Sequence, residues 1–159
     1  MIFIFLVILL CLFGFVLLFG APYVPTMRKQ SQTALDMVSL KPGQTLYELG
    51  SGDGRVLRQA AQRGYNVVGY EINPLLALIA YVYTWKYRKQ VKVVCGNFWK
   101  ADLAPADAVF VFLLDRYMEK LDNKMKNEVK KGTLLASFAF QIPDKKIAKQ
   151  SNGIFLYKY

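Results

Sequence analysis

The chain has 159 residues, 21 of them Lys or Arg against 11 Asp or Glu, so its formal net charge is +10. Without residues 1–20 the remainder is the size of one ordinary domain, which excludes a two-domain enzyme. Histidine is absent, which removes the commonest general base and metal ligand, so no metal site is expected. The positive charge suits an anionic partner without choosing among nucleic acid, phospholipid headgroups and acidic ligands.

Residues 1–20 contain no charged side chain. A helix of that length, at about 1.5 Å per residue, spans about 30 Å, the thickness of the hydrocarbon core of a bilayer. No basic residue precedes the apolar run, which favours a retained transmembrane anchor over a cleaved signal peptide. Arg28 and Lys29 follow it, so the positive-inside rule predicts a single-pass protein whose domain lies in the cytoplasm. A buried core helix is the alternative, although it would show a polar stripe.

Beyond the anchor, residues 21–43 form a juxtamembrane segment with an extended exit at Pro22 and Pro25 and one amphipathic helix. Residues 44–159 then alternate between strand-like and helix-like patterns. The expected helices are 30–40, 54–63, 74–88 and 118–129, and the expected strands are 45–49, 66–72, 91–95, 108–114 and 133–140. Two short strands around Ser151, Asn152 and Gly153 close the chain as a hairpin.

This alternation predicts an α/β fold: a Rossmann-like, mostly parallel sheet with helices on both faces and a C-terminal antiparallel hairpin. The apolar run 108–114 fits a strand buried on both faces. Cys11 and Cys95 are expected to be small buried hydrophobes rather than a disulfide pair. In such sheets ligands bind beyond the carboxyl ends of the strands.

Three glycines follow the first strand in "ELGSGDG", at positions 50, 52 and 54. Glycine lets the chain turn sharply and lets a ligand lie against the backbone. A tight turn that binds nothing is the alternative. Glu48 and Asp53 flank the loop, and their charges would repel a phosphate. The loop therefore favours a cationic ligand.

Two further groups end neighbouring strands. Glu71 ends the second strand, where a carboxylate can accept hydrogen bonds from ribose hydroxyls. Asn97, Phe98 and Trp99 follow the third strand and offer an amide and apolar rings to an adenine, although the rings could equally belong to the core. Ribose and adenine contacts beside acids, where phosphates would otherwise lie, point to S-adenosylmethionine.

The stretches "LYELGSGDGR", "VVGYEINP" and "GNFWKADL" resemble the seven-strand, Rossmann-like S-adenosylmethionine-dependent methyltransferases (class I). "PYVPT" and "FLLDRYMEKLDNKMKNEVKKGTLLASFAF" are similar to the small membrane-anchored protein-lysine methyltransferases, which include the one that modifies the ATP synthase c subunit. This resemblance implies lysine methylation on a protein substrate, which could be an integral membrane protein, with no nucleic-acid partner. It also implies cofactor contacts by Tyr23, Thr26, Glu48, Gly50, Ser51, Gly52, Asp53, Gly54, Glu71, Ile72, Asn97 and Phe98.

The chain departs from the subgroup after the fourth strand, where Leu114, Asp115 and Arg116 stand in place of a proline-containing turn. Asp115 is the candidate catalytic residue, because a carboxylate at this edge can orient an amine or accept its proton. Pairing with Arg116 or capping the next helix is the alternative. Nucleic-acid methyltransferases that act on base amino groups usually carry an Asn/Asp-Pro-Pro-aromatic turn here, which this chain lacks.

Other readings of the same cofactor site remain open. Methylation of a lipid or small hydrophobic molecule would need a different acceptor pocket only, and a non-catalytic cofactor-binding scaffold would need none. The aromatic residues of 81–87 are interpreted as packing or membrane-interface residues. The lysines of 120–131 are interpreted as a solvated helix face, whereas Lys145, Lys146 and Lys149 could rest against anionic headgroups.

Overall fold

The computed structural model describes residues 26–159. The expected anchor at 1–20 and the candidate residue Tyr23 lie outside this range. Among the residues that the structure describes, no helix has both the length and the apolar character needed to cross a membrane.

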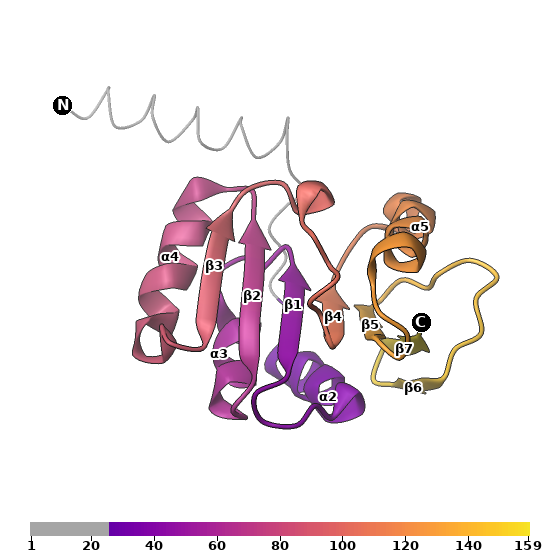
Figure 1. Cartoon of the computed structure of the whole chain (residues 1–159), viewed down its shortest axis with the longest axis horizontal. Helices are drawn as coiled ribbons and strands as arrows, with labels where there is room; N and C mark the ends of the chain where they lie inside the picture. The colour runs from indigo at the N-terminus through magenta and orange to yellow at the C-terminus, as the bar shows by residue number, and fades with distance from the viewer. Residues whose placement is uncertain (1–25) are drawn as a thin grey trace.

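One seven-stranded sheet forms the centre of the domain, in the order β3-β2-β1-β4-β5-β7-β6 (Figure 1). Its strands are β1 (Thr45–Leu49), β2 (Asn66–Glu71), β3 (Val91–Cys95), β4 (Ala108–Val111), β5 (Leu134–Phe138), β6 (Lys149–Ser151) and β7 (Ile154–Lys158). The first five are parallel, and β7 lies antiparallel between β5 and β6. The carboxyl ends of β1 to β5 therefore meet at one edge of the sheet.

Helices cover both faces, as the sequence predicts. They are α2 (Arg28–Val38), α3 (Arg55–Gln62), α4 (Pro74–Thr84) and α5 (Met118–Glu128), with 3₁₀ helices η1 (Trp85–Tyr87), η2 (Phe98–Lys100) and η3 (Asp115–Tyr117). The first apolar cluster joins α2 and α3 to one face through Leu46 and Phe110, and α4 packs beside α3. The second joins α5 to the other face through Tyr47 and Val109. Neighbouring strand residues point to opposite faces, so central strands such as β1 and β4 contribute to both clusters.

Strand β4 is shorter than the predicted 108–114. Its ladder with β1 ends where Leu49 pairs with Val111, because β1 gives way there to the glycine loop. Without that neighbour on one side, the chain leaves the sheet and enters η3. The predicted helix 74–88 likewise ends as an α-helix at Thr84 and continues as η1.

The C-terminal hairpin is confirmed. Its turn places Asn152 and Gly153 at φ 49° and 76°, the left-handed values that a tight two-residue hairpin turn requires. The prediction that Cys95 is buried is wrong: Cys95 is exposed. Cys95 is the last residue of β3, and β3 is an edge strand. A side chain at the end of an edge strand has fewer neighbours that could bury it.

Candidate active site at the carboxyl edge of the sheet

The glycine loop joins β1 to α3 and is fastened to the end of β2. Gly50, Gly52 and Gly54 have φ values of 95°, 53° and 80°, all in the left-handed region that favours glycine. The backbone N–H groups of Gly50 and Ser51 both donate to the Tyr70 carbonyl, at 2.9 and 2.8 Å. The loop therefore turns back over the sheet edge in a fixed conformation.

Two of these glycines meet different surroundings. A Cβ atom on Gly50 would find no heavy atom within 4 Å, so open space borders the backbone at this position. A Cβ atom on Gly54 would stand 2.9 Å from the Cβ of Ala80 in α4. Gly50 thus offers the bare backbone that a ligand needs, whereas Gly54 lets the start of α3 pack closely against α4.

Glu71 links the loop to the end of β2. Its side chain is buried, and its Oε2 accepts a 2.8 Å hydrogen bond from the Gly52 N–H. Its Oε1 accepts a 2.9 Å hydrogen bond from the Asn73 N–H. An ionised carboxylate offers about four acceptor positions, so lone pairs remain for hydroxyl donors. Ile72 follows at the same edge, 37% exposed.

Glu48 is the most unusual group at this edge. Only 4% of the residue is exposed, and its Oε2 has no hydrogen-bond partner among residues 26–159. Burial raises its pKa well above the ordinary value, and the carboxylates of Asp53 and Glu71 raise the pKa further. The Ser51 hydroxyl oxygen is also buried without a partner in the described part of the chain. A buried polar atom left unpaired costs about 1–3 kcal/mol, so this loop holds acceptor capacity that a bound cation or donor would use.

Asp53 differs from the other acids of the site, because a cation already accompanies it. The Arg55 side chain contacts both carboxylate oxygens, with a shortest distance of 2.7 Å between Nη2 and Oδ2. The pair is partly exposed. Its negative charge is therefore largely balanced within the loop, which leaves Glu48 and Glu71 as the buried acids that are candidates for ligand contacts.

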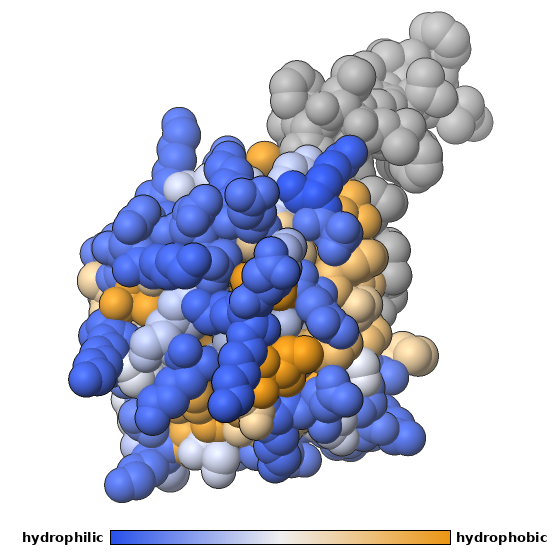
Figure 2. Space-filling view, turned by 90° about the vertical axis from the view of Figure 1, so that its right-hand side faces the viewer, coloured by the Kyte–Doolittle hydropathy of each residue, from blue (hydrophilic) through white to orange (hydrophobic). Residues whose placement is uncertain are grey.

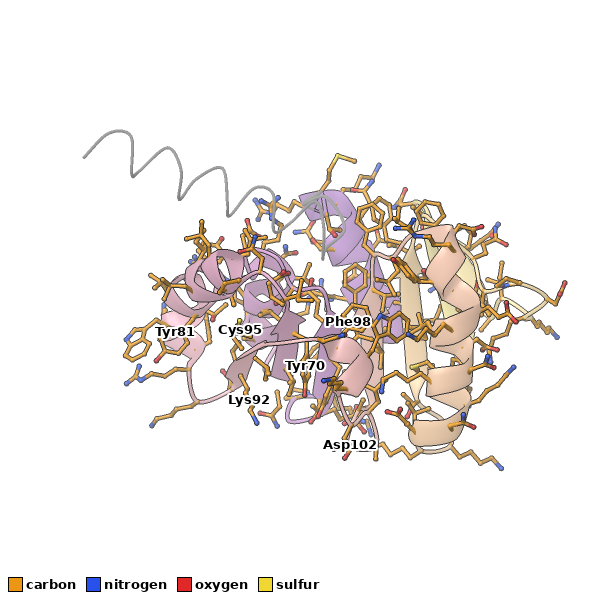
Figure 3. The ribbon with its side chains drawn as sticks, turned by 90° about the horizontal axis from the view of Figure 1, so that it is seen from above. Tyr70, Tyr81, Lys92, Cys95, Phe98 and Asp102 are labelled. Atoms are coloured by element: carbon orange, nitrogen blue, oxygen red, sulfur yellow. The ribbon has the colours of Figure 1, made fainter. Side chains whose placement is uncertain are left out.

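The residues that follow β3 form the neighbouring wall. The Asn97 Oδ1 accepts a 3.0 Å hydrogen bond from the Trp99 N–H and starts η2. The Phe98 and Trp99 rings lie 4.7 Å apart, both half-buried. Viewed from above the strand ends, Phe98 lies near Tyr70 at the centre of the edge (Figure 3). Asn97 itself is exposed, so its amide is accessible to a ligand.

Lys124 holds this wall in place, a role that its position in a basic helix did not predict. Only 8% of its side chain is exposed, and Nζ donates to the carbonyls of Trp99 and Ala101 at 3.2 and 2.6 Å. Glu128, one turn later, completes the pair at 2.7 Å. The sequence signal was the i,i+4 spacing of Lys124 and Glu128, which is indistinguishable from an ordinary surface pair. Lys124 is thus an exception to the interpretation of the lysines of 120–131 as mostly a solvated helix face.

Two further candidates lie at the margins. Asp115 is exposed and begins η3, just beyond the carboxyl end of β4. In the described chain neither η3 nor α5 has a side-chain cap hydrogen bond, so Asp115 does not cap α5. Thr26 is buried, two residues before the start of α2.

The residues present fit S-adenosylmethionine, which carries an ammonium, a sulfonium and a nucleoside. The Glu48 oxygen that has no partner among residues 26–159, with Glu71 nearby, suits the cations. Glu71 suits ribose hydroxyls, and Asn97 with Phe98 suits an adenine edge and face. Fold and site together define a class I, seven-strand, Rossmann-like methyltransferase with S-adenosylmethionine as its cofactor.

Comparisons with known proteins agree. A family model described as the ANTKMT methyltransferase domain matches residues 48–149. A protein-lysine N-methyltransferase of Saccharolobus islandicus is 33% identical over 86% of this chain and 92% of its own length. The human lysine N-methyltransferase named for the c subunit of ATP synthase is 29% identical over 77% of this chain and 53% of its own length. The chain belongs to the ANTKMT methyltransferase domain family.

A solved structure supports the same fold. The crystal structure of an RNA methyltransferase from Salinibacter ruber with S-adenosyl-L-homocysteine superposes with a TM-score of 0.78. It is 28% identical and covers 86% of this chain and 92% of that one. The chain thus spans nearly all of the archaeal and Salinibacter proteins and about half the length of the human one.

Proposed function

We propose that this chain methylates a lysine side chain of a protein and that residues 1–20 tether it to a membrane. The observation that carries the proposal is the buried carboxylate oxygen of Glu48, which has no partner in the described part of the chain, close in sequence to the open backbone of Gly50. The lysine acceptor is inferred from the relatives, whose names include protein-lysine N-methyltransferase.

When bound, the cofactor supplies an electrophilic methyl group on a positively charged sulfur. The chain contributes binding and positioning: Glu48 and Glu71 hold cationic and hydroxyl groups, and the glycine loop keeps side chains out of the space they need. An incoming lysine must reach the site with a neutral amine, because only the free lone pair is nucleophilic. Asp115, exposed at the same edge, is the group that we expect to orient this amine or to accept its proton.

The membrane tether is supported by the sequence of residues 1–20 and by the basic residues that follow. Each basic residue near an anionic bilayer adds about 1 kcal/mol of attraction. Of the three C-terminal lysines considered for this role, Lys146 and Lys149 are exposed. Lys145 instead pairs with Asp122 at 3.0 Å and lies 3.5 Å above the Tyr159 ring, so it is committed to the fold.

The direct test is methyl transfer in host membranes. The full chain, purified in detergent, would be incubated with S-adenosylmethionine labelled in its methyl group and membranes of the host. We expect a labelled protein band whose acid hydrolysate contains methyl-lysine, and we expect Glu48→Ala to abolish it. Asp36→Asn is the matched control, because Asp36 is a surface acid of α2 whose side chain is 69% exposed.

The same incubation separates the other candidate functions. Label in the lipid extract alone would establish lipid methylation in place of protein methylation. Cofactor binding by calorimetry without label in any fraction would favour a non-catalytic scaffold.

RNA is a second candidate acceptor, which the Salinibacter structure and the net charge of +10 favour. Against it, the stretch 114–117 lacks the Asn/Asp-Pro-Pro-aromatic turn. If label is found in purified RNA and persists after protease treatment, RNA rather than a protein lysine is the acceptor.

A further inference from the structure

Helix α4 carries its large apolar side chains on the outside. Its buried residues are small or polar: Ala77, Ala80 and Thr84. Four large aliphatic residues spaced three or four apart are exposed instead: Leu75, Leu78, Ile79 and Val82, by 49%, 58%, 43% and 65%. At 100° per residue these four lie opposite the buried three. A globular surface helix has the reverse arrangement.

Close packing against α3 explains the small residues of the inner side. Ala80 lies directly over Gly54, where even one added carbon would approach to 2.9 Å. The Thr84 hydroxyl donates to the Ala80 carbonyl at 2.7 Å, within the helix, and so needs no outside partner. The inner side has no room for large side chains. Their presence on the outer side is not explained by packing within the described chain.

Aromatic residues and cations extend the same surface. Tyr81, Tyr83 and Trp85 are 46–49% exposed, and Tyr81 points outward from α4 (Figure 3). The Arg88 guanidinium lies 5.1 Å from the Trp85 ring centre, and that of Arg58 lies 4.6 Å from the Tyr83 ring centre. Rings of this kind beside basic side chains are typical of the boundary between hydrocarbon and headgroups.

The charged residues in and after α4 have one sign. The stretch from 72 to 101 contains no Asp or Glu. Its basic residues are Lys86, Arg88, Lys89, Lys92 and Lys100. By contrast, the α5 and C-terminal side of the molecule, opposite α4, is mostly hydrophilic (Figure 2). The exposed apolar residues of α4 are thus followed directly along the chain by the exposed basic residues Lys86, Arg88 and Lys89.

We propose that the outer face of α4 lies on the surface of an anionic phospholipid bilayer. Leu75, Leu78, Ile79 and Val82 enter the acyl boundary, and Lys86, Arg88 and Lys89 contact the headgroups. The inference builds on the proposed membrane tether, which brings a bilayer within reach, and it adds a second contact that fixes the orientation of the domain.

Charge complementarity selects lipid over the other occupants. A second copy of the chain would bring one basic surface against another, with no acid to offset the repulsion. Residues 1–20 are apolar but uncharged, so they would provide no negative charge for the basic residues. An anionic bilayer matches both the apolar and the basic groups.

This orientation has a consequence for the active site. Asn73 caps the start of α4 by accepting from the Leu75 N–H at 2.9 Å, and its own N–H donates to Glu71. The first turn of α4 is therefore fixed to the ribose-holding acid of the site. With the outer face of α4 on the bilayer, the carboxyl edge of the sheet opens beside the headgroups, where a lysine of a membrane protein would be presented.

The test uses Trp85 as a depth probe in the full chain. The protein has two tryptophans, so Trp99→Phe leaves Trp85 as the single tryptophan, which can be excited selectively over tyrosine. This variant would be reconstituted into phosphatidylcholine and phosphatidylglycerol vesicles with or without bromine on the acyl chains. We expect brominated lipid to remove most of the Trp85 emission and aqueous acrylamide to remove little. Flotation of the vesicles reports the tether separately.

Substitutions on the exposed side of α4 supply the contrast. Leu78→Glu with Val82→Glu should reverse the pattern, so that acrylamide quenches Trp85 and brominated lipid does not, while the chain still floats. Asn123→Glu with Asn127→Glu adds the same charge to exposed positions of α5 and should leave the quenching by lipid intact.

Three outcomes would overturn the inference. Trp85 quenched by acrylamide in a chain that floats would show the face in water, with the tether unaffected. Trp85 shielded from both quenchers would show a protein contact in place of lipid. A chain that does not float at all would remove the tether as well as the α4 contact. Methyl transfer by the chain without substitutions, measured on a detergent-solubilised lysine-containing acceptor, tests the proposed function separately.

Discussion

The backbone N–H of Gly52 donates a 2.8 Å hydrogen bond to the buried carboxylate of Glu71, nineteen residues further along the chain. This bond joins the loop after β1 to the end of β2, so two parts of the candidate cofactor site are fixed to each other. An alteration of either partner should therefore be felt in both cofactor binding and stability.

Replacing Glu71 by Gln tests that coupling. An amide in this position would face two backbone donors, the Gly52 and Asn73 N–H groups, with one oxygen in place of two. We expect unfolding free energy to fall by about 1–3 kcal/mol, and cofactor affinity to fall at least tenfold. Chemical denaturation and calorimetry measure the two quantities. Unchanged affinity would remove Glu71 from the site.

Replacing Glu48 by Gln should have opposite effects on stability and binding. Burial, with the nearby Asp53 and Glu71, raises the Glu48 pKa in the folded state. Because the folded chain holds the Glu48 proton more tightly than the unfolded chain does, this group favours folding at a pH below the ordinary carboxyl pKa. That stabilisation is lost as the pH rises from the ordinary pKa through the raised pKa of the folded chain. At neutral pH the Gln variant should thus be more stable, by on the order of 1 kcal/mol, and should bind the cofactor more weakly.

Thermal unfolding against pH checks this prediction. The stability gain of Glu48→Gln should shrink as the pH falls and Glu48 becomes protonated. A gain that is independent of pH, or undiminished cofactor binding, would contradict it.

The two glycines Gly50 and Gly54 form a matched pair. Both have positive φ, so an Ala at either position carries a strain of about 1–2 kcal/mol. Gly54→Ala also forces a contact with Ala80, which adds about 1–3 kcal/mol. We expect Gly54→Ala to lower stability more, and Gly50→Ala to lower cofactor affinity more, relative to its effect on stability. Equal effects of both variants would contradict the separate roles.

Asp115 should matter for turnover rather than for cofactor binding. Asp115→Asn keeps the size of the side chain and removes its charge. We expect kcat to fall by about 10²-fold at unchanged cofactor Kd, since Asp115 lies outside the glycine loop. Steady-state kinetics with a lysine-containing acceptor and calorimetry measure the two constants. An unchanged kcat would return Asp115 to a structural role.

Asp122 should control stability in acid. Burial alone would raise its pKa, but hydrogen bonds from Lys126, Tyr159 and Lys145 outweigh burial and lower the pKa below the ordinary value. Its contribution is present above the pKa of about 4 in the unfolded chain and is lost as pH falls through the lower folded value. Asp122→Asn should cost about 1–3 kcal/mol at neutral pH and flatten the acid limb of the stability profile. A parallel downward shift of the whole profile would contradict this.

Most of the fold could be predicted because its rules are local. The observed bounds of β1 are those predicted, 45–49, because a mostly apolar run ends directly at a glycine-rich turn. The end of β4 could not be predicted from its apolar run 108–114, because the strand stops where its neighbour β1 stops. That limit depends on a segment some sixty residues away in sequence.

The candidate site shows the same division. The acids at the ends of β1 and β2 could be placed together from sequence, because parallel strands deliver their carboxyl ends to one edge. The bidentate Arg55 partner of Asp53 and the buried Nζ of Lys124 could not. Charged residues with the same spacing occur on any solvated helix, and only the packing of the chain decides which of them is enclosed.

By itself, then, the sequence determined the order of strands and helices, the glycine loop and the acids that flank it, because backbone preference and apolar periodicity act over a few residues. Tertiary structure alone decided that Gly54 packs on Ala80 while Gly50 borders open space, and that α4 turns its large side chains outward. The physical reason is that burial is a property of pairs of surfaces. Which side of a helix is covered is fixed by the partner that reaches it, and that partner lies elsewhere in the chain.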